Sequence, residues 1–287
     1  MKHIRPITCL VFIITLLAVI AAGTAILSHQ GPGPYNYESI RGELIKIHGQ
    51  GLYQHMSADV AIQGIAQDYV TLCIAVPLLL ISLFLARRGS RKALFVLSGT
   101  LGYFLLTYLF YTAMAMYNAM FLAYVFLLGA SFISFILVLF SYDVTNCKAW
   151  FASENQLRNA GIFLITNASL ISMLWLRIVL PPLFDGSIIP PEVQHYTTLV
   201  VQGFDLGLFL PMAFVVGILA LRRNAYGYLF TVIYTLFLAL LMTALTAKIL
   251  FMARTGAPVS PAIFIIPTIN GIAVLFSVAL LRNVTAR

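Results

Sequence analysis

Three ionisable side chains interrupt long apolar stretches of this sequence: Asp68, Asp205 and Lys248. Transfer of a charged side chain to the middle of a bilayer costs about 2.5–3.5 kcal/mol on insertion scales, so a charge in such a stretch is a candidate functional group. All three lie within roughly two or three helical turns of the same expected membrane boundary, at a rise of about 1.5 Å per residue. We therefore predict one polar cavity, open to the outer side, in which they bind a ligand or couple an ion.

A structural interpretation of the same residues stays open. Lys248 would then extend its ammonium group to the outer lipid headgroups, and Asp68 would cap a helix at the membrane surface. Asp205 lies deeper in its stretch and fits this interpretation less well. A pair between Asp205 and Lys248 would offset the cost of burying either charge.

Polar side chains near these charges extend the candidate ligand-binding set. Its further members are Gln67, Gln202, Tyr111 and Asn118. Tyr103, Thr107 and Tyr111 recur at intervals of four residues, which places three hydroxyl groups on one helical face. Such a face either lines a polar cavity or belongs to the aromatic belt at a membrane surface.

His48, His55 and Asp59 are the weak candidates for a metal site. At spacings of seven and four residues they would share one face of a continuous helix, and imidazole and carboxylate groups bind metals. Gly49 and Gly51 interrupt that helix, however, and the spacing matches no zinc signature. The sequence also lacks phosphate-binding, metalloprotease and serine-hydrolase motifs. It therefore predicts neither a metal nor a cofactor.

The composition indicates that these residues are positioned by helices in lipid. Of the 287 residues, 61% are hydrophobic and 9% are charged, against about 25% charged in a soluble domain. Apolar runs of about 20 residues can span a bilayer as helices, whereas barrel strands would be about half as long and alternate in polarity. Eight such runs occur: 7–27, 67–86, 93–115, 119–141, 159–180, 197–221, 226–250 and 262–281. We predict an all-α, polytopic transmembrane helical bundle of about eight spans, a single domain over 1–287.

The longest connection between the runs, 28–66, lies on the outer side in this arrangement. Within residues 38–47, charged and aliphatic side chains alternate in a pattern that predicts an amphipathic helix on the membrane surface. The first run, 7–27, also resembles a secretory signal peptide, but its apolar length exceeds the usual 7–15 or so residues. We interpret it as a retained anchor.

The basic residues determine the expected orientation, because Lys and Arg accumulate in cytoplasmic loops. With the N-terminus inside, twelve of the 17 basic residues fall on the inner side: Lys2, Arg5, Arg87, Arg88, Arg91, Lys92, Lys148, Arg158, Arg222, Arg223, Arg282 and Arg287. The other five are Arg41, Lys46, Arg177, Lys248 and Arg254. Both termini are thus predicted in the cytoplasm. The net charge of +8 follows from topology and requires no nucleic-acid partner; the expected partners are the lipid bilayer and an unknown small molecule or ion.

Two of the runs share an order of features. The second contains Gln63-Gly64, Asp68, Pro77 and Arg87-Arg88, and the sixth contains Gln202-Gly203, Asp205, Pro211 and Arg222-Arg223. Both runs are expected to cross from outside to inside. The shared order indicates a weak parallel internal repeat of four spans each, an arrangement that occurs in some transporters.

Five short segments carry a resemblance to a known group of proteins. They are Gly51-Leu52-Tyr53, Gln63 to Asp68, Val70-Thr71-Leu72, Pro77-Leu78-Leu79 and Tyr117 to Phe121. With these, residues 40–140 resemble a family of uncharacterised bacterial multispanning membrane proteins, and the likeness extends weakly to Asp205 and Pro211. The resemblance implies a helical membrane fold in the bacterial inner membrane. It implies no activity and no functional residue.

Three functional hypotheses follow. The leading one is a transporter or permease-like protein for a small solute or ion, in which Asp68, Asp205 and Lys248 bind or couple. The second is a membrane-embedded enzyme or a redox or metal module that acts at the outer surface through His48, His55 and Asp59. The third is a sensor or assembly partner without cavity chemistry. The lack of catalytic motifs favours a protein that is not an enzyme.

Overall fold

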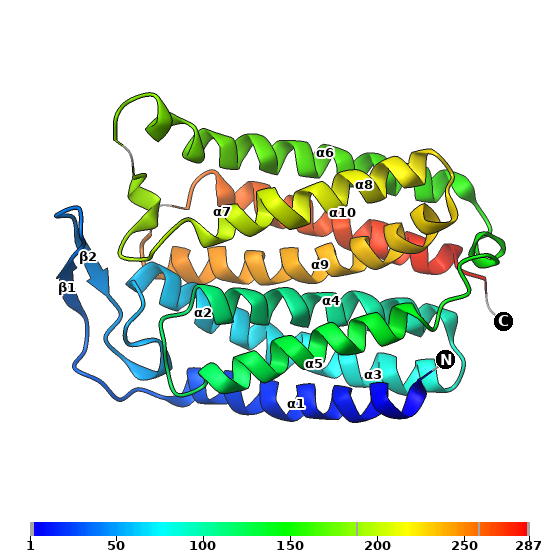
Figure 1. The fold of residues 1–287 in the computed structure, drawn as a ribbon, viewed down its shortest axis with the longest axis horizontal. Helices are drawn as coiled ribbons and strands as arrows, with labels where there is room; N and C mark the ends of the chain where they lie inside the picture. The colour runs from blue at the N-terminus through cyan, green and yellow to red at the C-terminus, as the bar shows by residue number, and fades with distance from the viewer. Residues whose placement is uncertain (1–2, 188, 258, 286–287) are drawn as a thin grey trace.

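The computed structural model describes residues 3–187, 189–257 and 259–285, and in them the chain is mostly helical. The helices are α1 (Ile4–Leu27), α2 (Ala58–Val70), α3 (Val76–Arg87), α4 (Arg91–Ala113), α5 (Phe121–Leu139), α6 (Glu154–Val179), α7 (Val200–Phe204), α8 (Leu210–Leu221), α9 (Ala225–Arg254) and α10 (Ala262–Asn283). Two π-helical segments, Thr71–Ala75 and Asp205–Phe209, join α2 to α3 and α7 to α8. Figure 1 shows the long helices side by side in one bundle.

Eight helical stretches of the described chain are long and apolar enough to cross a membrane, by length and composition. They match the eight predicted runs one to one, which confirms the predicted fold class. The second span begins at Ala58 instead of residue 67. Asp59 in the first turn explains the earlier start, because an acidic side chain there stabilises a helix N-terminus. Large apolar side chains such as Phe126 and Leu275 cover the outward faces, as expected of a surface in contact with lipid.

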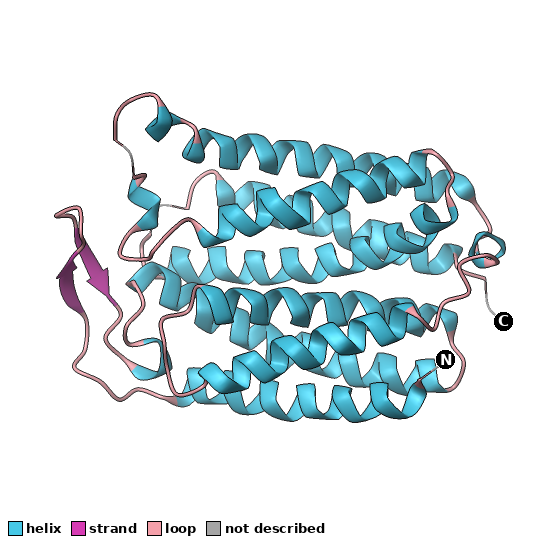
Figure 2. Cartoon of the chain, in the orientation of Figure 1, coloured by secondary structure: helices cyan, strands magenta, loops and turns pink. Residues whose placement is uncertain are grey.

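The connection between α1 and α2 differs from the prediction. The amphipathic helix predicted over 38–47 is absent from these described residues, where β1 (Tyr35–Glu38) pairs with β2 (Leu44–Ile47) as an antiparallel hairpin. Figure 2 shows the hairpin projecting from one end of the bundle. We call this the hairpin end; it also holds the α4–α5, α6–α7 and α9–α10 connections. Both ends of the chain lie at the opposite, terminal end (Figure 1).

The hairpin turn explains why the helix prediction was wrong. The Ser39 N–H donates to the Glu43 carbonyl oxygen at 2.8 Å, which leaves a loop of three residues between them. The last of these, Gly42, has a φ of +78°. A left-handed glycine at this place is typical of three-residue hairpin loops. The local turn chemistry therefore outweighs the spacing of the aliphatic side chains.

The two spans that contain a π-helical segment share a proline at the same place. Pro77 and Pro211 are each the second residue of the helix that follows the segment. A proline ring clashes with the carbonyl group four residues earlier and offers no N–H. A single wide turn accommodates both effects while the helix continues. This common feature supports the predicted parallel repeat.

When the two spans are aligned on Pro77 and Pro211, their acids fall at different positions. Asp68 lies nine residues before the proline of its span, the place that Gln202 takes in the other span. Asp205 lies six residues before its proline, the place of Thr71. The two spans therefore share the order of their features, but their acids do not correspond in this register. The carboxylates occupy places one helical turn apart in corresponding spans.

The bundle consists of two halves of four spans that have the same neighbours. In the first half α1 packs against α3, α3 against α4, α4 against α5 and α5 against α1; in the second half α6, α8, α9 and α10 form the same circuit. The halves meet where α4 and α2 pack against α9, near the middle of Figure 1. Glycines allow close approach: a Cβ at Gly99 of α4 would lie 2.6 Å from the Cβ of Leu236 on α9.

Candidate functional site

Asp68 lies in the interior between α2, α4 and the 3-10 turn Gly51–Tyr53, with 2% of its surface exposed. The Tyr53 hydroxyl donates to Asp68 Oδ2 at 2.6 Å, and the Tyr111 hydroxyl lies 3.0 Å from Oδ1. The shorter distance is typical of a hydroxyl group bonded to a carboxylate anion, about 2.5–2.7 Å. Each carboxylate oxygen thus has a phenol donor.

The Tyr111 hydroxyl has a second acceptor, because it also lies 3.1 Å from the Gly64 carbonyl oxygen. A phenol has one hydrogen, which it cannot give fully to both. When Asp68 takes up a proton on Oδ1, the carboxyl group donates to Tyr111, and Tyr111 donates to Gly64. The same heavy-atom positions therefore accommodate both the charged and the neutral carboxyl group.

Glycines bring Tyr53 close to α2. A Cβ at Gly64 would lie 3.0 Å from Cε2 of the Tyr53 ring, so the absence of a side chain lets the ring rest against the helix. Gly51 begins the turn with a φ of +59°. The Leu52 N–H donates to Ser28 Oγ at 2.8 Å, which ties the turn to the end of α1. These contacts aim the Tyr53 hydroxyl at Asp68.

Gln67, the residue before Asp68 on α2, forms a second buried network beside the first. Its Nε2 donates to the Tyr103 hydroxyl at 2.7 Å and to Thr107 Oγ1 at 3.0 Å. Thr71 Oγ1 lies 3.0 Å from the Tyr103 hydroxyl and donates to the Gln67 carbonyl oxygen at 2.9 Å. The predicted hydroxyl-bearing face, with Tyr111, therefore faces α2 in the interior. Among the described residues, Gln67 Oε1 is buried without a hydrogen-bond partner.

Asp205 accepts a hydrogen bond from another helix, and Lys248 interacts with both acids. The Trp175 indole N–H of α6 donates to Asp205 Oδ2 at 2.8 Å. Lys248 of α9 interacts electrostatically with both Asp68 and Asp205. Within the described part of the chain, no ion pair within 4.0 Å joins Lys248 to either acid. The predicted direct Asp205–Lys248 pair is thus not formed, but the three groups lie in electrostatic range. We call them the charged cluster.

Asn118 and Gln202 lie in two other parts of the fold, the α4–α5 connection and the hairpin end. Asn118 stabilises the α4–α5 connection, where its Oδ1 accepts from the Met120 N–H at 2.9 Å and its Nδ2 donates to the Met116 carbonyl oxygen at 3.2 Å. Gln202 lines a pocket at the hairpin end instead. The structure therefore joins Asp68 to Tyr111 and places Gln67 in a neighbouring network. The other two amides lie in the α4–α5 connection and at the hairpin-end pocket.

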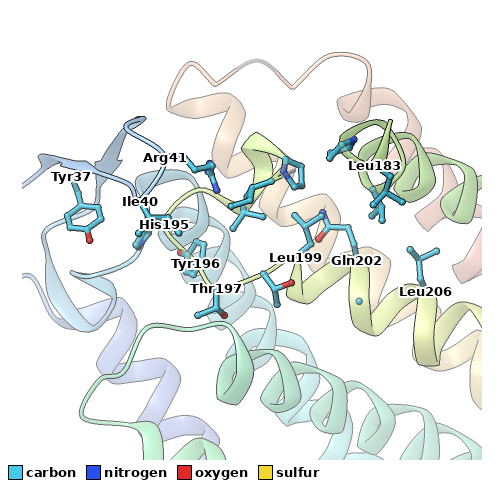
Figure 3. Close-up of a pocket in the computed structure, with 17 residues that line it drawn as sticks. Tyr37, Ile40, Arg41, Leu183, His195, Tyr196, Thr197, Leu199, Gln202 and Leu206 are labelled. Carbon is cyan, nitrogen blue, oxygen red and sulfur yellow. The ribbon is translucent and has the colours of Figure 1, made fainter. Parts of the chain in front are cut away.

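The pocket has a volume of about 590 Å³ and lies between the hairpin, the α6–α7 connection and α7. Figure 3 shows its labelled side chains, including Arg41, His195, Tyr196 and Gln202. The Tyr196 hydroxyl accepts from the Ser57 N–H at 3.3 Å. Burial raises the pKa of Tyr196, so its hydroxyl group stays neutral at pH 7. The charged cluster does not line this hairpin-end pocket.

His48, His55 and Asp59 do not form a metal site. In the described chain, no group of three or more His, Cys, Asp or Glu residues could hold a metal ion. Asp59 is exposed in the first turn of α2, and the His55 carbonyl oxygen lies 3.1 Å from His195 Nε2. Burial lowers the pKa of His48 below its usual 6.5.

Sequence reasoning missed Tyr53, Trp175 and Arg41. Tyr53 and Trp175 each contact their acid from a different segment of the chain, so spacing along one helix gave no signal. One available signal was composition: the chain has two Trp residues, and an indole N–H within an apolar span needs an acceptor. Arg41 was counted for its charge and not as part of a site.

A comparison of the chain with protein-family models, curated proteins and solved structures found no match. The resemblance to bacterial multispanning membrane proteins stays a prediction.

Proposed function

We propose that the chain is a transporter or permease for a small solute or ion. The observation that carries the proposal is the charged cluster, in which Lys248 interacts with Asp68 and Asp205 without a direct ion pair. Charges within a span are costly, and a purely structural pair offsets that cost best at hydrogen-bonding distance. An open cluster instead leaves the charges available to a transported species.

The charges of the cluster favour a cationic species. Two carboxylates and one ammonium group have a net charge of −1, which one proton, one monovalent cation or one cationic solute neutralises. Asp68 can take up the proton at its present position, because Tyr111 can turn its hydrogen from Asp68 to Gly64. We therefore favour a cation, or a solute coupled to a proton, as the cargo.

The charged cluster is divided between the two halves, so a movement of one half relative to the other would change it. Asp68 belongs to the first half and Asp205 and Lys248 to the second, and α2 packs against α9 across the boundary. Parallel repeats related by an axis along the membrane normal occur in transporters. One π-helical segment begins at Asp205 and the other begins three residues after Asp68, and such turns are frequent at functional sites.

We further propose the bacterial inner membrane as the location, with the terminal end in the cytoplasm. The paired arginines at the ends of α3 and α8 lie at the terminal end, and cytoplasmic loops are enriched in arginine. The resemblance to bacterial membrane proteins supports this membrane. The hairpin and its pocket would then face the outside.

Transport currents from proteoliposomes test the proposal. Wild-type protein on a solid-supported membrane is exposed to concentration steps of protons, Na⁺, K⁺ and small organic ammonium ions. At least one step should produce a transient current. Asp68→Asn should abolish it, because the amide keeps the shape of the neutral acid but takes up no cation. Asp205→Asn should reduce it as well.

Asp59→Asn is the matched control, since Asp59 is an exposed acid on the same helix as Asp68. It should leave the current unchanged. All variants are compared at equal amounts of folded protein, measured by size-exclusion chromatography and circular dichroism. A wild-type current that persists in folded Asp68→Asn protein would contradict the role of the cluster, and a wild type silent to every cation would contradict the proposed cargo.

A further inference from the structure

The hairpin-end pocket contains a buried cation with unused hydrogen-bond donors. The Arg41 side chain is 13% exposed, and its Nη2 donates to Glu43 Oε2 and to the Gln194 carbonyl oxygen, both at 2.9 Å. The second bond ties the hairpin to the α6–α7 connection. Its Nε and Nη1 are buried and have no partner in the described chain. A guanidinium group has five N–H donors, so three of them remain free.

The free donors of Arg41 favour an anionic ligand. A buried donor without an acceptor is costly, and the cost is larger for a charged group. No Asp or Glu is among the described residues that line the pocket, and Arg41 is their one formal charge. Glu43 occupies the Nη2 side of the guanidinium group, which leaves Nε and Nη1 for a second anion.

His195 adds an acceptor on the same side of the pocket (Figure 3). Its Nε2 lies 3.1 Å from the His55 carbonyl oxygen. A carbonyl group can only accept, so Nε2 carries the hydrogen in this contact. Nδ1 is buried without a partner in the described residues, and in the neutral ring it is an acceptor. An anion that retains one hydroxyl group, such as a singly protonated phosphate monoester, would satisfy both Arg41 and His195.

The opposite wall of the pocket carries apolar side chains beside Gln202. Leu199, Gly203 and Leu206 lie on one face of the α7 span, and Leu183 faces them from the α6–α7 connection (Figure 3). Leu206 lies in the π-helical segment directly after Asp205, so this wall continues towards the membrane span. The volume of about 590 Å³ falls within the ~300–1,000 Å³ typical of small-molecule sites.

We propose that the hairpin-end pocket binds an anionic amphiphile, with a phosphate or carboxylate head on Arg41 and His195 and an alkyl chain along Leu199 and Leu206. The inference does not depend on the transport function proposed for the charged cluster. A phosphate monoester should bind more tightly than a carboxylate, because it can also donate a hydrogen bond to His195 Nδ1. The shared chemistry fits both a membrane phospholipid and a free single-chain amphiphile.

Native mass spectrometry of the protein in phosphatidylcholine nanodiscs tests the site. Decyl phosphate should bind with a stoichiometry of one, and decanoate more weakly. Inorganic phosphate lacks the chain, and decyltrimethylammonium has the opposite charge, so neither should give a stoichiometric complex. Arg41→Gln should weaken decyl phosphate binding by about tenfold or more, as expected for loss of a charged hydrogen-bonding group. Lys46→Gln, which removes an exposed charge from the same hairpin, should not.

A second pair of variants tests the apolar wall without touching Arg41. Around a Cβ at Gly203 or at Gly207 no described atom lies within 4 Å, so both positions tolerate a side chain. Gly203→Leu fills the pocket and should abolish binding of decyl phosphate. Gly207→Leu adds the same side chain outside the pocket and should leave binding intact. This comparison remains valid if Arg41→Gln fails to fold.

A competition experiment identifies the source of the ligand. Competition by phosphatidic acid added to the nanodiscs would assign the site to a membrane lipid, and failure to compete would assign it to a free single-chain amphiphile. Equal binding of decyl phosphate and decyltrimethylammonium would overturn the proposal, as would equal binding by Gly203→Leu and Gly207→Leu.

Discussion

Replacement of Tyr53 by phenylalanine should destabilise the folded protein by about 2 kcal/mol. The change removes one hydroxyl group and leaves Asp68 Oδ2 without its donor at 2.6 Å. Both residues are 2% exposed, so water does not replace the lost bond. Hydrogen bonds to charged groups contribute about 1.5–3 kcal/mol, and an unsatisfied buried acceptor costs a similar amount.

Tyr111→Phe should cost less, about 1 kcal/mol. Its single hydrogen is divided between Asp68 at 3.0 Å and Gly64 at 3.1 Å, and Asp68 keeps Tyr53 when Tyr111 is changed. A hydrogen that is divided between two acceptors makes a weaker bond to each, so we expect the contribution of an ordinary hydrogen bond, about 0.5–1.5 kcal/mol. The structure therefore predicts a larger loss of stability for Tyr53→Phe than for Tyr111→Phe, although both tyrosines contact the same acid.

SDS-induced unfolding in mixed micelles, followed by circular dichroism, measures these free energies. Tyr117→Phe is the control, because Tyr117 is 79% exposed and should change stability by less than about 0.5 kcal/mol. In an Asp68→Leu background the cost of Tyr53→Phe should fall close to zero, since the acceptor is gone. A Tyr53→Phe effect as small as that of Tyr117→Phe, or one unchanged in the Asp68→Leu background, would refute the hydrogen bond as the source of stability.

Three further predictions concern packing and pH. Gly64→Ala would place a Cβ 3.0 Å from the Tyr53 ring and should cost about 1–3 kcal/mol in the same unfolding assay. Gly99→Ala should cost a similar amount, because its Cβ would lie 2.6 Å from the Cβ of Leu236 at the contact between the two halves. Burial lowers the pKa of His48, so below pH 6.5 the unfolded chain binds a proton that the folded chain does not, and stability falls as the pH falls. Stability of His48→Gln, measured from pH 7.5 downwards, should depend less on pH.

The membrane spans could be predicted because the bilayer imposes one length on every helix that crosses it. Apolar runs of about 20 residues satisfy that length without reference to tertiary structure. The hairpin could not be predicted in the same way. Residues 38–47 alternate charged and aliphatic side chains in a pattern that suits a helix or a strand over so short a stretch. Gly42, with its left-handed backbone, decides between them, and a single glycine in a polar segment gives a weak signal.

The charged cluster was predictable in its members but not in its contacts. Asp68, Asp205 and Lys248 stood out because a charge in an apolar run is costly wherever the helix packs. Their partners Tyr53 and Trp175 come from a loop turn and from a different span, so only tertiary packing brings them to the acids. The predicted outward cavity around the charges also does not coincide with the hairpin-end pocket, which is built from the hairpin, the α6–α7 connection and α7.

The register of the two halves shows why the charged cluster is not symmetric. Pro77 and Pro211 are 134 residues apart in the sequence. Arg91 and Ala225, the first residues of α4 and α9, are separated by the same interval. In this register α9, with 30 residues, continues beyond the end of α4, which has 23. Lys248 falls in that extension, so it has no counterpart on α4. The lysine is therefore specific to the second half.

The single lysine and the two non-equivalent acids limit how many cations the proposed transporter can bind in one cycle. The acids lie one turn, about 5 Å, apart in the common register, so their interactions with Lys248 are not related by the symmetry of the halves. Neutralisation of either acid leaves the other opposite the ammonium group, with no net charge in the cluster. A second cation would then enter a site that is already neutral, in a medium where an unpaired charge costs several kcal/mol. We therefore expect one monovalent cation per transport cycle, measurable as the ratio of charge to solute in the proteoliposome currents.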